Sequence, residues 1–499
     1  MLLQMNGITK SYGSLTANAS VDFSLREGEI HALVGENGAG KTTLMRILYG
    51  MEQPTAGSIH LLGKEAHFAN PTDAIRSGIG MVHQHFMLFP SFTVAENIVI
   101  GNEPKSGVKF DRKKAVRQVE SLCAKYRLPI DPHKKVADCP LGLQQRVEIL
   151  KVLYQGADII ILDEPTGVLT PLEAKELLVI MKSLASQGKS FIIITHKLHE
   201  VMEVADRVTV LRDGKVTGTL DAGATNVEHL SKLMVGRELA NATRNQVKLG
   251  ETVLEVKEVS MQGEKGKPVL DRVSLQVRAG EIVGIAGISG NGQSELIQSI
   301  TGLQTIDGGQ IRLLGKDVTG RSVREIRDSG LSHIPEDRYQ WGAAKEGTVL
   351  ENGTMGHHRF YRRGGVLKGQ SLRTLVGGFI RQFQIKAGSQ ESKVKFLSGG
   401  NLQKLIVARE IAQNQPLLIA AEPTRGVDIG AMELIHDEIL KKRDAQGAIL
   451  LVSSELTEIL KLSDRILVMY EGRIAGELSA QDATEEQISL WMAGGDAHA

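Results

Sequence analysis

The stretch from Gly35 to Thr43 has the residue types and the spacing that bind a chain of phosphates. It reads GENGAGKTT, follows the apolar run 30–34 and precedes a helical pattern that starts near residue 42. Glycines in such a loop let backbone N–H groups converge on phosphate oxygens, and the following helix points its positive end at the same anion. A plain glycine-rich turn is the alternative, but the strand–loop–helix context favours a nucleotide site.

Each position of this loop has an expected place in that site. The expected phosphate-binding residues are Gly35, Glu36, Asn37, Gly38, Ala39, Gly40, Lys41, Thr42 and Thr43. We expect the Lys41 ammonium to neutralise the β- and γ-phosphates, and the Thr42 hydroxyl to bind Mg²⁺. The motif therefore predicts ATP and Mg²⁺ as cofactors.

Four more polar residues of the first half are candidates for the same site. Asp163 and Glu164 end an apolar strand, His196 follows another such strand, and Gln84 lies in the run MVHQHF. Ligands of open α/β sheets bind at the carboxyl ends of the strands. We expect Asp163 to hold Mg²⁺ through water, Glu164 to polarise the attacking water, His196 to contact the γ-phosphate, and Gln84 to contact Mg²⁺ or the water. The alternatives are solvated acids at a strand end and a structural histidine.

The chain that must position these groups repeats itself. DRVTVLRDGKVTGTL from Asp206 matches DRILVMYEGRIAGEL from Asp464, at an offset of 464 − 206 = 258 residues. Each copy alternates short β-branched strands with helical patterns, which predicts an α/β fold with a mainly parallel sheet. We predict domains over 3–240 and 252–496, joined by a polar linker at 241–251.

Composition sets limits on the function. The chain has 499 residues, a formal net charge of +1, 41% hydrophobic and 4% aromatic residues. This balance gives no broad field for nucleic acid and few aromatic rings for base stacking. Two cysteines are too few for a disulfide framework, and no apolar run reaches the roughly 20 residues of a membrane helix. We therefore expect a cytoplasmic protein whose membrane partners, if it has them, are other chains.

The second copy keeps the glycines of the phosphate loop, but most of the residues expected to contact phosphate, Mg²⁺ or water are replaced. It reads GISGNGQS from Gly287 to Ser294, so Gln293 stands in the place of the lysine. Ala421 replaces the strand-end aspartate, Ser454 replaces the histidine, and Glu336 stands where the first copy has Gln84. The residues retained in this degenerate site are Gly287, Gly290, Gly292, Ser294 and the acid Glu422. Glu422 leaves residual hydrolysis at the second site open.

Nearly the whole chain resembles the ATP-binding cassette (ABC) transporter family. The resemblance rests on the phosphate loop and on the signature LSGGNLQK at 397–404, which is specific to that family. It implies two tandem P-loop cassettes, each with a helical signature subdomain, and ATPase activity. It also makes Tyr12 the adenine-stacking aromatic, Gln84 the Q-loop residue and His196 the switch histidine. Ser398, Gly399 and Gly400 become the signature residues that close on the partner cassette's nucleotide.

The resemblance further implies that the two cassettes pair head to tail within the chain. Each ATP then lies between the phosphate loop of one cassette and the signature of the other. In the first copy the signature is degenerate, with Pro140 in place of the serine and Gly142 retained. Proline has no N–H or hydroxyl for a γ-phosphate, although it suits the first turn of a helix. We therefore expect one composite site that keeps all its motif residues, and a second composite site in which all the substituted motif residues lie.

Fused double cassettes of this kind resemble the importer ATPases for simple sugars and nucleosides. The run GIGMVHQHFMLFPSFTVAENIVIG is closer to the nucleoside branch, since sugar-type members tend to have an acid where this chain has His85. The resemblance implies integral membrane permease subunits, an extracytoplasmic substrate-binding protein, and a peripheral position at the cytoplasmic face of the membrane. The apolar run 86–89 is either a permease contact or a local core.

Rival readings are a sugar importer of the ribose or galactose type, a soluble double cassette acting on ribosomes or DNA, and a P-loop kinase or GTPase. Soluble double cassettes usually carry a long charged linker, which this chain lacks. The signature and the duplication argue against a kinase or GTPase.

Overall fold

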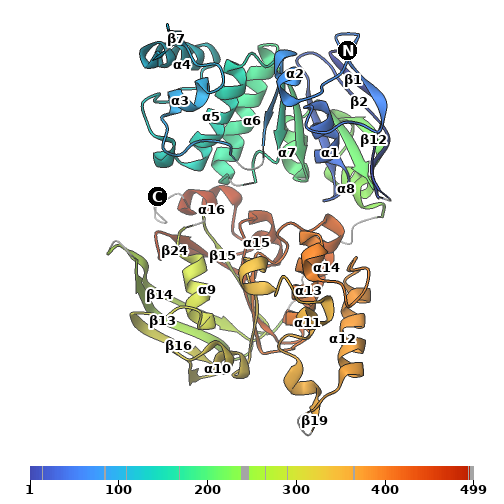
Figure 1. The fold of residues 1–499 in the computed structure, drawn as a ribbon. Helices are drawn as coiled ribbons and strands as arrows, with labels where there is room; N and C mark the ends of the chain where they lie inside the picture. The colour runs from blue at the N-terminus through green and yellow to red at the C-terminus, as the bar shows by residue number, and fades with distance from the viewer. Residues whose placement is uncertain are drawn as a thin grey trace. The chain divides into compact units, whose positions relative to one another are not determined.

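The computed structural model describes residues 1–13, 15–83, 86–107, 109–167, 169–237, 245, 247–263, 266–288, 290–363, 366–492 and 494. The chain divides into two compact units, Met1–Leu239 and Ala240–Ala499. Each unit is built in the same way and is described by itself (Figure 1).

The first unit contains a mixed, mainly parallel sheet. Its strands are, in spatial order, β12 (Lys215–Asp221), β11 (Arg207–Arg212), β3 (Ile30–Gly35), β10 (Ser190–Thr195), β9 (Ile159–Asp163) and β6 (Ile79–Val82). Only the β11–β12 pair is antiparallel. Ile160 and Ile193 face one apolar cluster, whereas Ile161 and Ile192 face another. The sheet is therefore buried on both faces, as its continuous apolar strands require.

A separate antiparallel sheet covers one side of the first unit, and sequence analysis did not anticipate it. Its strands are, in order, β2 (Leu15–Leu25), β1 (Leu3–Tyr12), β4 (Ala56–Leu61) and β5 (Lys64–Ala66). It packs with α1 (Lys41–Leu48) into the cluster that includes Leu3, Phe23 and Leu44. The sheet thereby supports the phosphate loop from the side.

Helices complete the first unit. They are α2 (Pro71–Arg76), α3 (Val94–Val99), α4 (Arg112–Tyr126), α5 (Leu141–Tyr154), α6 (Pro171–Ser186), α7 (Leu198–Val204) and α8 (Val227–Val235). The helices α3, α4 and α5 form a helical subdomain with the short hairpin β7 (Lys105–Ser106) and β8 (Lys109–Phe110). In Figure 1 it lies on the opposite side of the unit from β1 and β2.

The second unit repeats this plan. Its mainly parallel sheet runs β18 (Leu331–Ile334), β21 (Leu417–Ala421), β22 (Ala448–Val452), β15 (Ile282–Ala286), β23 (Arg465–Tyr470) and β24 (Arg473–Ser479). Its antiparallel sheet runs β14 (Pro268–Arg278), β13 (Thr252–Gln262), β16 (Gly308–Leu313) and β17 (Lys316–Asp317). The helices are α9 (Gln293–Thr301), α10 (Val323–Asp328), α11 (Val349–Thr354), α12 (Gly369–Gln382), α13 (Gly399–Ile411), α14 (Ile429–Asp444), α15 (Leu456–Leu462) and α16 (Glu485–Met492). A small hairpin joins β19 (Arg362–Arg363) to β20 (Val366–Leu367).

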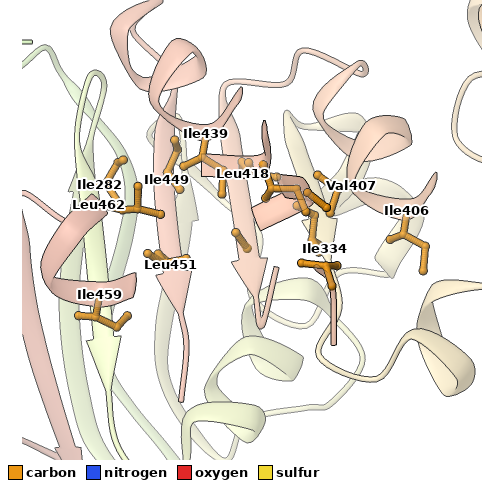
Figure 2. Packing of buried hydrophobic residues seen from close by; sticks show 14 of the residues in the cluster. Ile282, Ile334, Ile406, Val407, Leu418, Ile439, Ile449, Leu451, Ile459 and Leu462 are labelled. Atoms are coloured by element: carbon orange, nitrogen blue, oxygen red, sulfur yellow. The ribbon is translucent and has the colours of Figure 1, made fainter. Parts of the chain in front are cut away.

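Figure 2 shows one of the two cores of the second unit. Leu418, Ile449 and Leu451 of the central strands meet Ile439 of α14 and Ile459 of α15. All five side chains are fully buried. This core holds the signature helix α13 and the strand ends of β21 and β22 in one rigid body, which is what a site at the edge of the sheet needs.

The described residues at 245 and 247–250 lie against the second unit. The buried Arg443 donates from Nη2 to the carbonyl of Asn245 at 3.1 Å, and Gln446 Nε2 donates to the carbonyl of Lys248 at 3.2 Å. The amide of Gly250 donates to Ala279 O at 2.9 Å. We call residues 245–250 the strap. The described part of the strap is thus hydrogen-bonded to the rest of the second unit through its backbone carbonyl and amide groups.

Candidate functional site

Three strand ends come together beside the phosphate loop of the first unit. In the parallel register Thr195 of β10 pairs with Val34 of β3, and Ile194 pairs with Asp163 of β9. The loop leaves β3 at this edge, and Glu164 and His196 directly follow β9 and β10. The register therefore brings the predicted loop, the predicted acids and the predicted histidine to one edge of the sheet.

The backbone of the loop is shaped for an anion. Gly38 has φ 84° and Gly40 has φ 98°, a left-handed conformation that side chains disfavour. A Cβ at Gly40 would lie 2.3 Å from the carbonyl oxygen of Ala17 in β2, so only glycine fits there. Gly40 caps α1 without a side-chain hydrogen bond, which leaves the first N–H groups of the helix available to phosphate oxygens.

Lys41 lies across this loop. Its Nζ donates to the carbonyls of Gly35 at 2.7 Å and Glu36 at 3.0 Å, and the residue is buried. Burial lowers the pKa of the ammonium, whereas Glu164 and Asp163 raise it. Lys41 is thus a buried positive charge on the phosphate loop.

The acid Asp163 is suited to a cation. Burial, followed by the neighbouring Glu164, raises the pKa of its carboxyl to about 6. A half-buried carboxylate with a raised pKa is stabilised by a divalent ion, and Thr42 in the first turn of α1 adds a hydroxyl. The described residues therefore fit Mg²⁺. Gln84, the third expected ligand, lies outside the described residues, as does His85.

Glu164 and His196 form a pair. Glu164 has φ 47°, and its amide donates to Ile194 O at 2.9 Å, which turns the side chain out of the strand. Its Oε1 lies 3.1 Å from Nδ1 of His196. This hydrogen bond is the main reason why the pKa of the Glu164 carboxyl is lowered. The pair therefore keeps Glu164 in the ionised form that a water-polarising base needs.

Tyr12 lies at the end of the β1–β2 hairpin. It pairs with Leu15 and its ring is well exposed, with Lys10 Nζ 5.0 Å from the ring centroid. The same hairpin contacts the phosphate loop, because Asn18 Nδ2 donates to Gly40 O at 3.1 Å. The Tyr12 ring is thus exposed on a hairpin that contacts the loop, and its adenine contact stays a prediction.

The loop of the second unit has nearly the same backbone. Gly290 has φ 93° and Gly292 has φ 101°, and Gly292 caps α9 without a side-chain hydrogen bond. Gln293 is buried as Lys41 is, and its Nε2 lies 1.9 Å from where a Cβ of Gly287 would be. The glycines thus preserve the cradle, while the side chain that folds over it has no charge.

The glutamate at the strand end of the second unit has the same backbone conformation as Glu164, but a serine takes the place of its histidine partner. Glu422 has φ 49°, and its carboxylate accepts from the amide of Ser454 at 2.7 Å and from the Ser454 hydroxyl at 3.1 Å. Burial, followed by Glu458, raises the pKa of Glu422 to about 7. The Glu422 carboxyl is therefore less readily ionised than that of Glu164, whose pKa is lowered. Ala421 is buried and has no carboxylate.

A carboxylate approaches the second loop from another strand. Ser294, in the first turn of α9, donates from Oγ to Glu336 Oε2 at 2.8 Å. Glu336 follows β18, which pairs with β21 through Ile334 and Ala420. Glu336 is therefore at the same edge of the sheet as Glu422. The strands β18 and β22 flank β21, and Glu336 follows the one on the side away from β22.

The two signature helices begin differently. Ser398 caps α13, and its Oγ accepts from the amide of Asn401 at 3.3 Å and from Asn401 Nδ2 at 2.8 Å. A Cβ at Gly400 would lie 3.2 Å from Gly426 O, so glycine lets the next loop approach closely. Gly399 starts the helix. This is an exposed, hydroxyl-capped helix start that can present donors to a ligand.

In the first unit, α5 starts after Pro140, and a glutamate carboxylate of the same unit accepts a hydrogen bond from its N-terminus. Gly142 N donates to Glu173 Oε1 at 3.2 Å, and the other oxygen of that carboxylate accepts from Thr170 N at 3.0 Å. A Cβ at Gly142 would lie 2.4 Å from Glu173 Oε1. The matching position of α14 is Ala431. Sequence analysis missed this contact, although the T-x-x-E capping box at 170–173 was a signal that the acid sits at a helix start.

Two other expectations have structural outcomes. Met87 and Phe89 are 58% and 50% exposed, whereas Leu88 packs on the helical core, so the run 86–89 is divided between surface and interior. Among the described residues, no helix is both long enough and apolar enough to cross a membrane.

Known proteins match the chain along its length. The family model described as ABC transporter matches residues 19–167 and 270–425. The guanosine import ATP-binding protein NupO of Bacillus subtilis is 47% identical, over 99% of this chain and 97% of that protein. The nucleoside import ATP-binding protein NupA of Lactococcus lactis is 45% identical, over 99% and 98%. The glucose import ATP-binding protein TsgD13 of Haloferax volcanii is 44% identical, over 99% and 96%.

Both matched segments contain a phosphate loop and a strand-end acid, one set per unit. Family match, repeated α/β fold and site geometry agree, and the chain belongs to the ABC transporter family, as an ATP-hydrolysing protein with two cassettes.

Proposed function

We propose that this chain is the ATPase subunit that energises nucleoside import through a membrane transporter. The observation that carries the proposal is the 45–47% identity, over nearly the full length, to proteins named for nucleoside and guanosine import. The histidine-flanked run MVHQHF, in place of the acid typical of sugar-type members, supports the same choice. Simple-sugar import is the second candidate, favoured by the similar identity to the glucose import protein.

Hydrolysis is proposed at the first phosphate loop. Glu164, kept ionised by His196, orients water for in-line attack on the γ-phosphate. Lys41 and the loop amides stabilise the charge that develops on the phosphate oxygens. Thr42, Asp163 and Gln84 would hold Mg²⁺, whose charge would neutralise the phosphate chain. His196 acts in this scheme by positioning Glu164 as well as by facing the γ-phosphate.

The remaining donors of this site come from the other cassette. In the head-to-tail pairing of the family, Ser398, Gly399 and Gly400 close on the nucleotide held by Lys41. Closure then assembles the catalytic site, so ATP favours the closed pair and ADP the open one. The opposite composite site combines Gln293, Ala421 and Ser454 with Pro140 and Gly142. It retains nucleotide binding at most, because its charge and its signature donors are both changed.

The partners follow from the import function. We propose integral membrane permease subunits, an extracytoplasmic substrate-binding protein, and a position at the cytoplasmic face of the membrane. The exposed Met87 and Phe89, with Phe92 stacked on Phe89 at 5.3 Å between ring centroids, offer an apolar permease contact on the first unit. The near-neutral charge of the chain gives no support to a nucleic-acid partner.

The test is thermal stabilisation of the purified transporter, with its binding protein, by a panel of nucleosides and simple sugars. We expect nucleosides such as guanosine to raise the melting temperature of the binding protein and to stimulate ATP hydrolysis by the complete complex. A transporter with Lys41→Ala serves as control, because ligand binding then persists without hydrolysis. Stabilisation and stimulation by glucose or pentoses alone would contradict nucleoside import and leave the ATPase mechanism standing.

A further inference from the structure

We propose that a hairpin in the helical part of the second unit binds the anionic lipid surface of the membrane. We call its exposed surface the basic hairpin, and its members are Arg359, Phe360, Arg362, Val366, Leu367 and Lys368. The inference rests on the proposed function in one respect, the peripheral position of the chain at the membrane. It does not depend on which solute is transported.

The stretch that contains this hairpin has an unusual charge. Residues 352–390 include seven arginines and lysines and no aspartate or glutamate, so the stretch carries +7 in a chain whose net charge is +1. The rest of the chain therefore carries +1 − 7 = −6. The corresponding stretch of the first unit, 97–132, has eight basic residues and four acids. The near-neutral total thus hides a strongly positive region of the second unit, and blocks of like charge often bind a partner of opposite charge.

Apolar side chains lie among these charges at the hairpin. Arg362 of β19 pairs with Leu367 of β20, and Val366 and Leu367 are 71% and 46% exposed. Phe360, in the helical turn before β19, is 58% exposed, and the guanidinium carbon of Arg359 lies 4.7 Å from its ring centroid. None of the three apolar side chains belongs to the apolar clusters of the described residues. Packing within the fold therefore does not explain why they are there.

The base of the hairpin is fixed, whereas two of its positive charges are unpaired. The amide of Lys368 donates to Tyr361 O at 2.9 Å, and Arg359 donates from Nη1 to the carboxylate of Asp328 at the end of α10. In the part of the chain that the structure describes, Arg362 and Lys368 have no acidic partner. Within the second unit, the hairpin labelled β19 lies at the opposite end from α16 (Figure 1). The hairpin thus presents cations and apolar groups together at one end of the unit.

The hairpin lies beside the second unit's counterpart of the proposed permease contact. Tyr339 and Trp341 stand at the positions that Met87 and Phe89 have in the first unit, and they are likewise exposed. Trp341 and Met355 line a cavity of about 430 Å³, and Met355 directly precedes the segment that leads into the hairpin. A permease bound at this surface brings the adjoining hairpin towards the lipid headgroups.

An anionic lipid surface suits both kinds of side chain in the basic hairpin. Each lysine or arginine close to such a surface raises the affinity by about fivefold. Exposed apolar side chains enter the boundary between headgroups and acyl chains, where amphipathic segments bury their apolar face. A nucleic acid would use the cations and the Phe360 ring, but it would leave Val366 and Leu367 in water. The composition of the hairpin therefore favours lipid.

The experiment is co-sedimentation of the purified full-length chain with lipid vesicles at low salt, without permease subunits. We expect the chain to bind vesicles of equal parts phosphatidylglycerol and phosphatidylcholine, to leave them at high salt, and to leave pure phosphatidylcholine vesicles unbound. Arg362→Gln combined with Lys368→Gln should weaken binding by about 20-fold, as two lost cations require. Val366→Ser combined with Leu367→Ser should weaken it by about tenfold, because the apolar contact is lost.

Lys316→Gln combined with Lys461→Gln is the matched control. It removes two exposed positive charges of the same unit from β17 and α15, outside the hairpin, and should bind vesicles as the unchanged chain does. Thermal melting of each variant reports folding. The proposal is overturned if the chain binds both kinds of vesicle equally, if it binds neither, or if both hairpin variants bind as the control does.

Two further outcomes also decide the question. A control variant that loses as much affinity as the hairpin variants would show that only the total charge matters, which contradicts the proposal. Hairpin variants that lose affinity for an RNA oligonucleotide but keep their affinity for vesicles would assign the surface to nucleic acid and overturn it as well. Vesicle binding needs neither permease nor solute, so a failure of nucleosides to stabilise the transporter leaves all these outcomes readable.

Discussion

The phosphate loops of the two units differ in chemistry far more than in shape. Gly40 and Gly292 have φ values of 98° and 101°, and the strand-end glutamates turn at 47° and 49°. Lys41 and Gln293 are both buried and both fold back over the first glycine of their loop. What differs is the ionisation of Glu164 and Glu422, because the hydrogen bond to His196 lowers the pKa of Glu164, whereas burial and the neighbouring Glu458 raise the pKa of Glu422.

This comparison shows that the shape of a loop and its reactivity are encoded by different residues. Glycines and the carbonyls packed against them keep the backbone, while a few side chains set the charge. A duplicated domain can therefore lose catalysis at one site and keep a folded nucleotide cradle. The following changes separate the two properties, from the largest expected effect to the smallest.

Substitution of the residue that follows Gly40 or Gly292 should give the largest difference in ATP hydrolysis between the two units. Lys41→Ala removes a buried positive charge from the loop and should lower kcat for ATP hydrolysis by about 100-fold or more. Gln293→Ala removes only an amide and should leave hydrolysis almost unchanged. Steady-state phosphate release by the purified transporter measures both. Similar losses for the two variants would show that the sites are catalytically equivalent.

Neutralising the strand-end acids should also separate the units. Glu164→Gln removes the ionised group that polarises water and should reduce kcat by about 100-fold, with ATP binding retained. Glu422→Gln should have little effect, because the second unit has Gln293 and Ala421 in place of the loop lysine and the strand-end aspartate. Hydrolysis assays paired with equilibrium ATP binding distinguish lost chemistry from lost affinity. Full activity of Glu164→Gln would contradict its assigned role.

The signature helices should respond in opposite ways. Ser398→Ala removes one hydroxyl donor to a charged phosphate, worth about 1.5 kcal/mol, and should slow hydrolysis by about tenfold. Pro140→Ser alone should not improve nucleotide binding at the degenerate site, since Glu173 still occupies Gly142 N. Only the double variant with Glu173→Ala frees that helix start. Binding of 8-azido-ATP to each unit is the measurement, and a gain from Pro140→Ser alone would show that Glu173 is no obstacle.

The buried His333 should make the second unit less stable in acid. Burial lowers the pKa of His333 from 6.5 to about 4, so the folded second unit binds fewer protons than the unfolded chain. Stability is therefore complete above pH 6.5 and declines as the pH falls towards 4, by on the order of 2–3 kcal/mol. His333→Asn should flatten this decline for the second unit, and exposed His358→Asn should not. Calorimetric melting between pH 4.5 and 7.5 checks it.

Local patterns predicted the site better than its surroundings. The loop at 35–43 and the acids at 163–164 were identified because their conformations follow from adjacent glycines and from a strand end. The antiparallel sheet of β1 and β2 and the contact between Gly142 and Glu173 depend on pairings between distant segments, which no local spacing encodes. His196 was expected to face a γ-phosphate, and its hydrogen bond to Glu164 is the additional feature that the fold supplies.

The strap has a consequence for how two half-proteins could be made from this gene. Arg443 is almost wholly buried and uses the Asn245 carbonyl as an acceptor, and Gln446 uses that of Lys248. A second half that began after residue 250 would leave both donors without these acceptors. A split before residue 245 keeps both hydrogen bonds, because the second polypeptide then includes the strap.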